Sequence, residues 1–136
     1  MNRLATTPVV ILAGLAVALG VTGCGGNSKP AYCADRAKLE SSVKDLPNAL
    51  KTGGTGGLQS QLQTIQSDAN AAISSARSDF PTETSAVKTN VEQLKTAVAG
   101  LPASPSAAQV AAIAVNASAV VNAVKAYTNA TKSKCQ

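Results

Sequence analysis

Apolar residues recur every three or four positions along most of the chain beyond residue 30. From Leu39 onward they are separated by four, three and four residues, which is the spacing of one face of an α-helix. Glu40 and Lys44 lie one turn apart, in the order that stabilises a helix. Pro47 lacks an N–H group and therefore ends or kinks the helix. The pattern predicts a first helix in AYCADRAKLESSVKDLPNAL, interrupted at Pro47.

Three further stretches have the same periodicity and predict three more helices. Their expected buried positions are Leu58, Leu62, Ile65, Ala69, Ala72, Ala76 and Phe80 in the second helix, Val87, Val91, Leu94, Val98 and Leu101 in the third, and Val110, Ile113, Ala117, Val120, Val124, Tyr127 and Thr131 in the fourth. Val115 and Val121 lie off the stripe of the fourth helix. They either widen its buried face or form a second apolar face for a partner or ligand.

Glycine and proline mark the boundaries between these helices. The GGTGG run, Gly53–Gly57, has neither the preceding strand nor the following Lys-Ser/Thr of a phosphate-binding loop, so it is interpreted as a helix–helix connection. Gly100 and Pro102 close the third helix. Ser104 is the expected N-cap of the fourth helix, with Pro105 at its first position.

Four helices joined by short breaks predict an all-α fold, an antiparallel up-and-down four-helix bundle over residues 31–136. In such a bundle the start of the first helix and the end of the fourth lie at the same end. Cys33 and Cys135 should therefore meet there. The core is expected to be thin, because the chain has one Phe, two Tyr and no Trp.

The N-terminal segment has the composition of an export signal. Arg3 precedes Val9–Val21, a run of 13 uncharged and mostly apolar residues, which is the length of a signal-peptide apolar region. A membrane-spanning helix needs roughly 20 apolar residues, and glycines dilute the continuation of this run. A retained membrane anchor and an ordinary secretory signal with a chance cysteine are the alternatives.

The four residues Val21-Thr22-Gly23-Cys24 resemble the lipobox of bacterial lipoproteins, in which an apolar residue and two small residues precede a cysteine. The resemblance covers residues 1–24 only. It implies that residues 1–23 are a cleaved signal peptide and that Cys24 carries a diacylglycerol. Two acyl chains are enough for stable anchoring, so the expected location is the outer face of the cell membrane. Residues 24–30 then form a flexible tether.

The composition of the remaining chain is weakly similar to that of small exported lipoproteins of high-GC actinobacteria, a likeness that implies no activity. Once Cys24 is assigned to lipidation, Cys33 and Cys135 remain. Exported proteins meet an oxidising compartment, where two such cysteines predict one disulfide. Two free thiols or an intermolecular bridge are the alternatives.

Few residues suit catalysis or metal binding. The sequence has no histidine, which excludes Ser-His-Asp catalysis and histidine-ligated zinc. The seven acidic residues are scattered, and Asp79 and Glu83 are interpreted as helix-terminus residues rather than an acid/base pair. No catalytic residue, metal ligand or cofactor is assigned. The net charge is +5, but the basic residues are dispersed and aromatic residues are rare, which argues against nucleic-acid binding.

Three functional hypotheses follow. The first, and the expected one, is a membrane-anchored envelope lipoprotein acting as a structural or interaction module without catalysis. The second is a carrier for a lipid or another apolar ligand. The third is an enzyme of unrecognised type. A closed bundle favours the first, a continuous apolar cavity of several hundred Å³ favours the second, and carboxylates clustered in a cleft favour the third. The protein partner, the ligand and the ligand-binding residues are not identified by the sequence.

Overall fold

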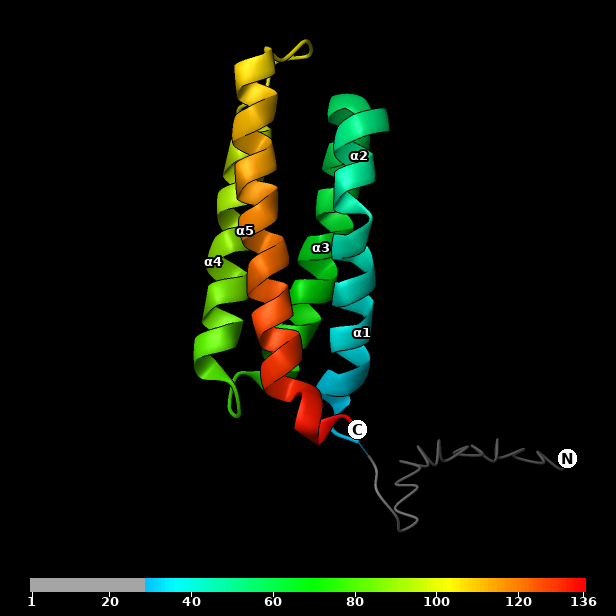
Figure 1. The fold of residues 1–136 in the computed structure, drawn as a ribbon, viewed down its shortest axis with the longest axis vertical. Coiled ribbons are helices and arrows are strands. Elements are labelled where there is room, and N and C mark those ends of the chain that lie inside the picture. Colours follow the sequence, from blue (N-terminus) through cyan, green and yellow to red (C-terminus); the bar gives the residue numbers. More distant parts are fainter. Residues whose placement is uncertain (1–28) are drawn as a thin grey trace, which may run out of the picture.

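The computed structural model describes residues 29–136, and all its regular elements are helical (Figure 1). They are α1 (Ala31–Lys44), α2 (Leu46–Thr52), α3 (Gly54–Ala76), α4 (Pro81–Ala99), α5 (Ala107–Thr131) and the short 3₁₀ helix η1 (Lys132–Lys134). This confirms the all-α helical bundle. The predicted signal peptide, the lipidation site Cys24 and most of the tether lie outside the described residues.

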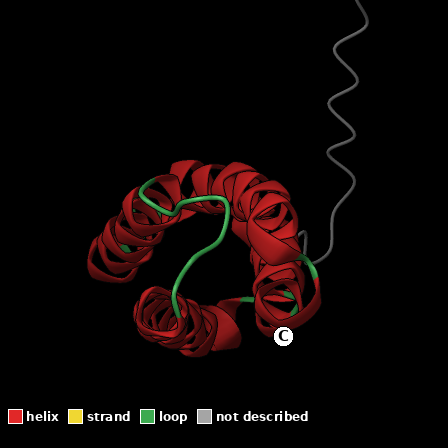
Figure 2. Cartoon of the chain, turned by 90° about the horizontal axis from the view of Figure 1, so that it is seen from above, coloured by secondary structure: helices red, strands yellow, loops and turns green. Residues whose placement is uncertain are grey.

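The helices form an antiparallel bundle of four legs, in which α1 and α2 together make the first leg. This leg packs against α3, α3 packs against α4, and α4 packs against α5. Helix α5 closes the ring by packing against α1 and, to a smaller extent, α2 (Figure 2). Within residues 29–136, the four legs enclose one continuous hydrophobic core.

The first leg is interrupted close to Pro47, where the sequence predicts a break. Asp45 separates α1 from α2, and Pro47 lies in the first turn of α2. A proline is tolerated there because the N–H groups of a first helical turn have no partner within the helix. The carbonyl of Asp45 accepts hydrogen bonds from the backbone N–H groups of Asn48 and Ala49, which starts α2 at once.

Two predicted helix boundaries are wrong. The Gly53–Gly57 run is not a connection throughout, because α3 begins at Gly54. Gly54 has φ +56°, a left-handed conformation that glycine adopts without a steric cost, so the chain reverses within about two residues. The fourth helix begins at Ala107 instead of Pro105. Its N-cap is Ser106, whose hydroxyl accepts from the Gln109 N–H while the Gln109 side chain accepts from the Ser106 N–H.

Most of the predicted stripe positions are buried. The exceptions are Val110, which is 39% exposed, and three positions that are only partly buried: Leu50, Phe80 and Leu101. Phe80 lies at the cysteine end of the bundle and packs edge-on against Tyr32, with 5.6 Å between ring centroids. Leu50 lies near the end of α2, Leu101 follows α4, and Val110 lies near the start of α5, so all three lie at the opposite end. There α5 diverges from α2 (Figure 1). The core is therefore less completely closed at that end.

Candidate ligand-binding groove

A disulfide between Cys33 and Cys135 joins the first turn of α1 to the residue that follows η1, which confirms the predicted pairing. The two Cα atoms lie 5.5 Å apart, although 102 positions separate them in the sequence. The bond fastens α5 to α1 at the end of the bundle where the described chain begins and ends. It leaves the far end of the same interface, next to α2, without a covalent constraint.

Side-chain hydrogen bonds fasten α1 to α3 along its length. Ser75 donates to the Asp35 carboxylate at 2.8 Å, and Ser42 donates to the Asp68 carboxylate. The side-chain amide of Gln61 donates to the carbonyl of Ser42 at 2.6 Å. Such bonds stabilise an interface by about 1 kcal/mol each. The α1–α3 interface is therefore held by polar contacts near both ends of α1.

The interface of α1 and α2 with α5 is different. Its one side-chain hydrogen bond among the described residues is the long contact of 3.5 Å from the Arg36 guanidinium to the carbonyl of Thr128, at the cysteine end. Between this point and the far end of the bundle, the interface is hollowed. The seam between α5 and the first leg thus has fewer side-chain hydrogen bonds than the α1–α3 interface, and hollows lie along it.

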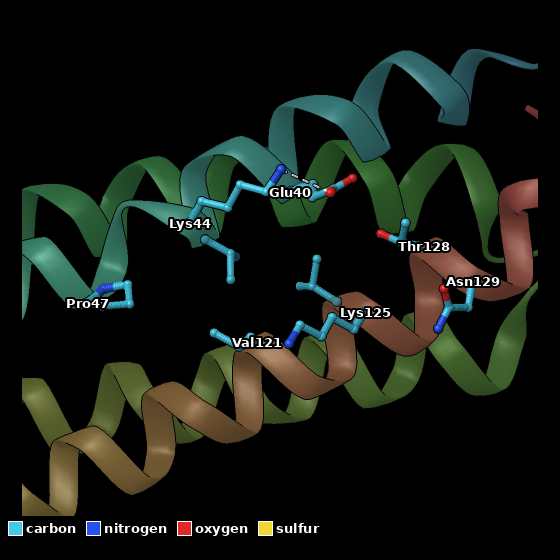
Figure 3. A pocket seen from close by; sticks show the side chains of 9 residues that line it. Glu40, Lys44, Pro47, Val121, Lys125, Thr128 and Asn129 are labelled. Atoms are coloured by element: carbon cyan, nitrogen blue, oxygen red, sulfur yellow. Dashed lines mark ion pairs between the residues drawn. The ribbon is translucent and has the colours of Figure 1, made fainter.

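Two adjoining hollows form a groove along this seam, which we call the α5 groove. Figure 3 shows the one nearer the cysteine end. The hollow nearer the cysteine end has a volume of about 480 Å³, and the other has a volume of about 570 Å³. Pro47, Val121 and Lys125 line both of them, so the two hollows are parts of one continuous depression. On the α5 side the groove extends from Asn129 to Val110.

The far end of the groove continues beneath the loop between α4 and α5. A smaller hollow of about 150 Å³ shares Leu50 and Val110 with the groove. Its remaining lining includes Leu101, Ala103 and Pro105 from loop 100–106. Figure 2 shows this end of the bundle, where the loop runs across from α4 to α5. The loop therefore covers the end of the groove that the disulfide does not close.

The floor of the groove is apolar and its rim is basic. Six of the apolar lining residues are Val43, Leu46, Leu50, Ala117, Val121 and Val124. The charged lining residues are Glu40, Lys44, Lys51 and Lys125. Glu40 and Lys44 form an ion pair at 3.2 Å, and this is the one ion pair among residues 29–136. Lys51 and Lys125 consequently have no carboxylate within ion-pair distance in the described chain.

Three buried polar atoms without partners belong to residues of α1 and α5 near the cysteine end of the bundle. The hydroxyl oxygen of Thr128, the Nε of Arg36 and the hydroxyl of Tyr127 are buried and make no hydrogen bond to the described chain. Tyr127 points into the core, where burial raises the pKa of its phenol to about 12, with a further contribution from Asp35. Thr128 lines the groove itself.

Other sequence-based expectations have mixed outcomes. Val121 lines the groove, but Val115 is 71% exposed and lines no hollow described here, so the two valines do not share a second apolar face. Glu83 lies in the first turn of α4, as a helix-terminus residue should. Among residues 29–136, no three or more Cys, Asp or Glu side chains are grouped so that they could hold a metal ion. The groove lining was missed, since the sequence does not show which helix seam is incompletely packed.

By length and composition alone, the segment Ala107–Lys134 could cross a membrane. In the bundle its buried stripe packs against the other helices, which is the behaviour of a core helix. Only 28% of its most apolar window is buried, however, and Val110 and Val115 are its exposed large apolar side chains. Of these two, Val110 lines the groove.

Comparisons of this chain with models of protein families, with curated proteins and with solved structures found no match. The function of the groove is therefore inferred from its own shape, polarity and charge.

Proposed function

We propose that the protein is an exported lipoprotein, anchored to the cell membrane through Cys24, whose helical bundle binds an apolar or amphiphilic ligand in the α5 groove without catalysis. The observation that carries this proposal is the continuous groove of several hundred Å³ between α5 and the first leg. It favours the carrier hypothesis over a closed bundle that acts only through its outer surface.

The dimensions of the groove suit a chain-like ligand. Small-molecule sites commonly have volumes of about 300 to 1,000 Å³ and mostly apolar linings, and both hollows fall in this range. From Val110 to Asn129, α5 advances about 29 Å. One leaflet of the hydrocarbon core of a bilayer is about 15 Å thick. An extended acyl chain therefore fits along the groove with room left for a polar group.

The chemistry of the groove supports binding rather than catalysis. Its one acidic lining residue, Glu40, is already paired with Lys44. The sequence offers no histidine as a general base. Thr128 supplies a hydroxyl, but no carboxylate is hydrogen-bonded to it. We therefore propose no reaction at this site, and assign its residues to holding a ligand.

The proposed anchor would keep the groove near a source of apolar ligands. Residues 24–30 can span at most about 25 Å when fully extended. Helix α1 begins directly after them, at the cysteine end of the bundle. A diacylglycerol on Cys24 would therefore hold this end close to the membrane surface, where lipids and lipid-like molecules are available.

Binding of an uncharged fluorescent probe tests the proposal. The mature chain 24–136 with Cys24→Ser, made in an oxidising compartment, is titrated with N-phenyl-1-naphthylamine. We expect saturable binding of one probe per chain. Ala114→Trp places an indole ring in the groove and should weaken binding at least tenfold. Ala114 is exposed and lies outside the core, so this substitution should leave the fold intact.

Val115→Trp is the matched control, because Val115 is on the same helix but faces solvent. It should leave the affinity for the probe unchanged. Absence of saturable binding, or equal affinities for both tryptophan variants, would contradict the proposed function.

A further inference from the structure

We infer that the ligand of the α5 groove is an anionic lipid with a single acyl chain, held with its head group near Lys125 and its chain extended toward Val110. This inference rests on the proposed function and specifies the class of ligand. It is drawn from the distribution of charge, polarity and volume along the groove.

The charge of the groove favours an anion. Three of its four charged lining residues are lysines, and the single carboxylate is neutralised by one of them. Lys125 lies at the junction of the two hollows, and its side chain runs along α5 toward Val121 (Figure 3). An ammonium group on a partly apolar surface attracts an anionic group more strongly than it does in bulk water. Lys125 is therefore the principal contact assigned to the head group.

The polarity of the groove gives the ligand a direction. Thr128 and Asn129 line the end near the disulfide, together with the Glu40–Lys44 pair. The buried hydroxyl of Thr128 has no hydrogen-bond partner in the described chain. The hollow at the far end is lined by more aliphatic side chains, among them Leu46, Leu50 and Val110. Lys51, Ser118 and Asn122 also line it. A polar head group at the first end and an apolar chain at the second satisfy both environments.

The length and volume of the apolar part suit one chain. From Lys125 to Val110, α5 advances about 22 Å, which exceeds the length of one bilayer leaflet of about 15 Å. The hollow at this end, of about 570 Å³, has room for on the order of 20 groups the size of a water molecule at about 30 Å³ each. A methylene group is of similar size, so one acyl chain of ordinary length fills the hollow.

Two other occupants are conceivable for an apolar groove between helices, namely a helix of a partner protein and a second copy of this chain. A partner helix would cover the groove and remove its centre from water. Because burying an unpaired charge is costly, a groove that binds a helix is expected to have no such charge at its centre. Lys125 lies at the centre of the groove and has no carboxylate partner in the described chain. The anionic lipid is thus the occupant that the observations favour.

The test compares two lipids that differ only in head-group charge. The mature chain 24–136 with Cys24→Ser is titrated by calorimetry with palmitoyl lysophosphatidylglycerol, which is anionic, and with palmitoyl lysophosphatidylcholine, which is zwitterionic, both below their micelle-forming concentrations. We expect the anionic lipid to bind about threefold to tenfold more tightly, the effect of one or two partly exposed ion pairs. Lys125→Glu should abolish this preference, and Lys125→Gln should reduce it.

Lys88→Glu is the matched control, because Lys88 is an exposed lysine on α4 that does not line the groove. It should leave the preference unchanged. Equal affinities for the two lipids, or a preference that Lys125→Glu does not alter, would overturn the inference about the lipid. The proposed function would still be supported if the fluorescent probe binds. Binding of the probe without binding of either lysolipid would also overturn the inference about the lipid and would leave the proposed function supported. Sedimentation of the free chain as a dimer that cannot bind the probe would overturn both.

Discussion

Cys33 and Cys135 are joined across 102 positions of sequence, and their disulfide closes one end of the seam between α1 and α5. The opposite end of the same seam has no comparable bond, and the two hollows of the α5 groove lie between. The disulfide therefore fixes the position of α5 relative to α1 while leaving room for a ligand along the rest of the seam.

Breaking this disulfide should destabilise the bundle strongly. A loop of about 100 residues gives an upper estimate of about 4 to 5 kcal/mol from the entropy of the unfolded chain. The thin core, built mainly from Ala, Val and Leu, has little stability to spare. We expect the Cys33→Ser, Cys135→Ser double variant to melt at a clearly lower temperature by circular dichroism and to retain a helical spectrum under mild conditions. Two titratable thiols in the non-reduced exported protein would contradict the account.

Removing the N-cap of α5 should cost about 1 kcal/mol of unfolding free energy. Ser106→Ala deletes the hydroxyl that accepts from the N–H of Gln109, and leaves that N–H without its partner. Urea unfolding measures the change. Ser104→Ala is the control, because Ser104 lies in the loop and caps no helix in the structure. A larger loss from Ser104→Ala than from Ser106→Ala would contradict Ser106 as the N-cap and favour a helix that begins at Pro105.

Ionisation of Tyr127 should destabilise the bundle at high pH. Its pKa is about 12 in the folded chain and about 10 in the unfolded chain, so between these values only the unfolded state releases the proton. The free energy of unfolding should therefore fall as the pH rises from 10 to 12. Tyr127→Phe should remove this part of the fall.

The same substitution should cost less than about 1 kcal/mol at neutral pH, or stabilise the protein, because it removes a buried hydroxyl that has no hydrogen-bond partner in the described chain. Urea unfolding at pH 7 and at several values above pH 10 measures both effects. A large loss of stability at pH 7 would show that the hydroxyl has a partner.

Lipidation is tested at Cys24. Because residues 21–24 resemble a lipobox, Cys24→Ala should abolish acylation and leave an uncleaved precursor or a released soluble form. Intact mass spectrometry of the membrane-extracted protein measures the result. A mature chain without acyl mass at Cys24 in the unsubstituted protein would rule out this anchor.

Much of the fold could be predicted from periodicity, because the apolar residues of each helix recur regularly every three or four positions. One residue from each of these stripes is fully buried: Leu39, Ile65, Leu94 and Val120. The helix boundaries were harder. Ser104 and Ser106 both precede α5, and only the reciprocal bonds with Gln109 decide between them. Likewise, Gly54 can begin a helix or occupy a loop, and the hydrogen bond from the Gly57 N–H to the Gly53 carbonyl, which starts α3, cannot be read from the sequence.

The groove could not be predicted from the sequence. Val110 and Val121 have the same chemistry as the buried valines, and periodicity does not show how far two helices diverge. That depends on the interruption at Pro47 and on hydrogen bonds, such as Ser75 to Asp35, that draw α1 toward α3. The location of the disulfide was predictable, because an even number of antiparallel helices brings both ends of the chain together.

The central claim is that the α5 groove holds a lipid, and native mass spectrometry of the lipidated protein from its own membrane tests it most directly. The account predicts one anionic single-chain lipid per protein chain, present in the unsubstituted protein and in Val115→Trp, and lost from Ala114→Trp, in which an indole ring fills the groove. A protein that carries no lipid, or an Ala114→Trp variant that retains as much lipid as the unsubstituted protein, would contradict the account.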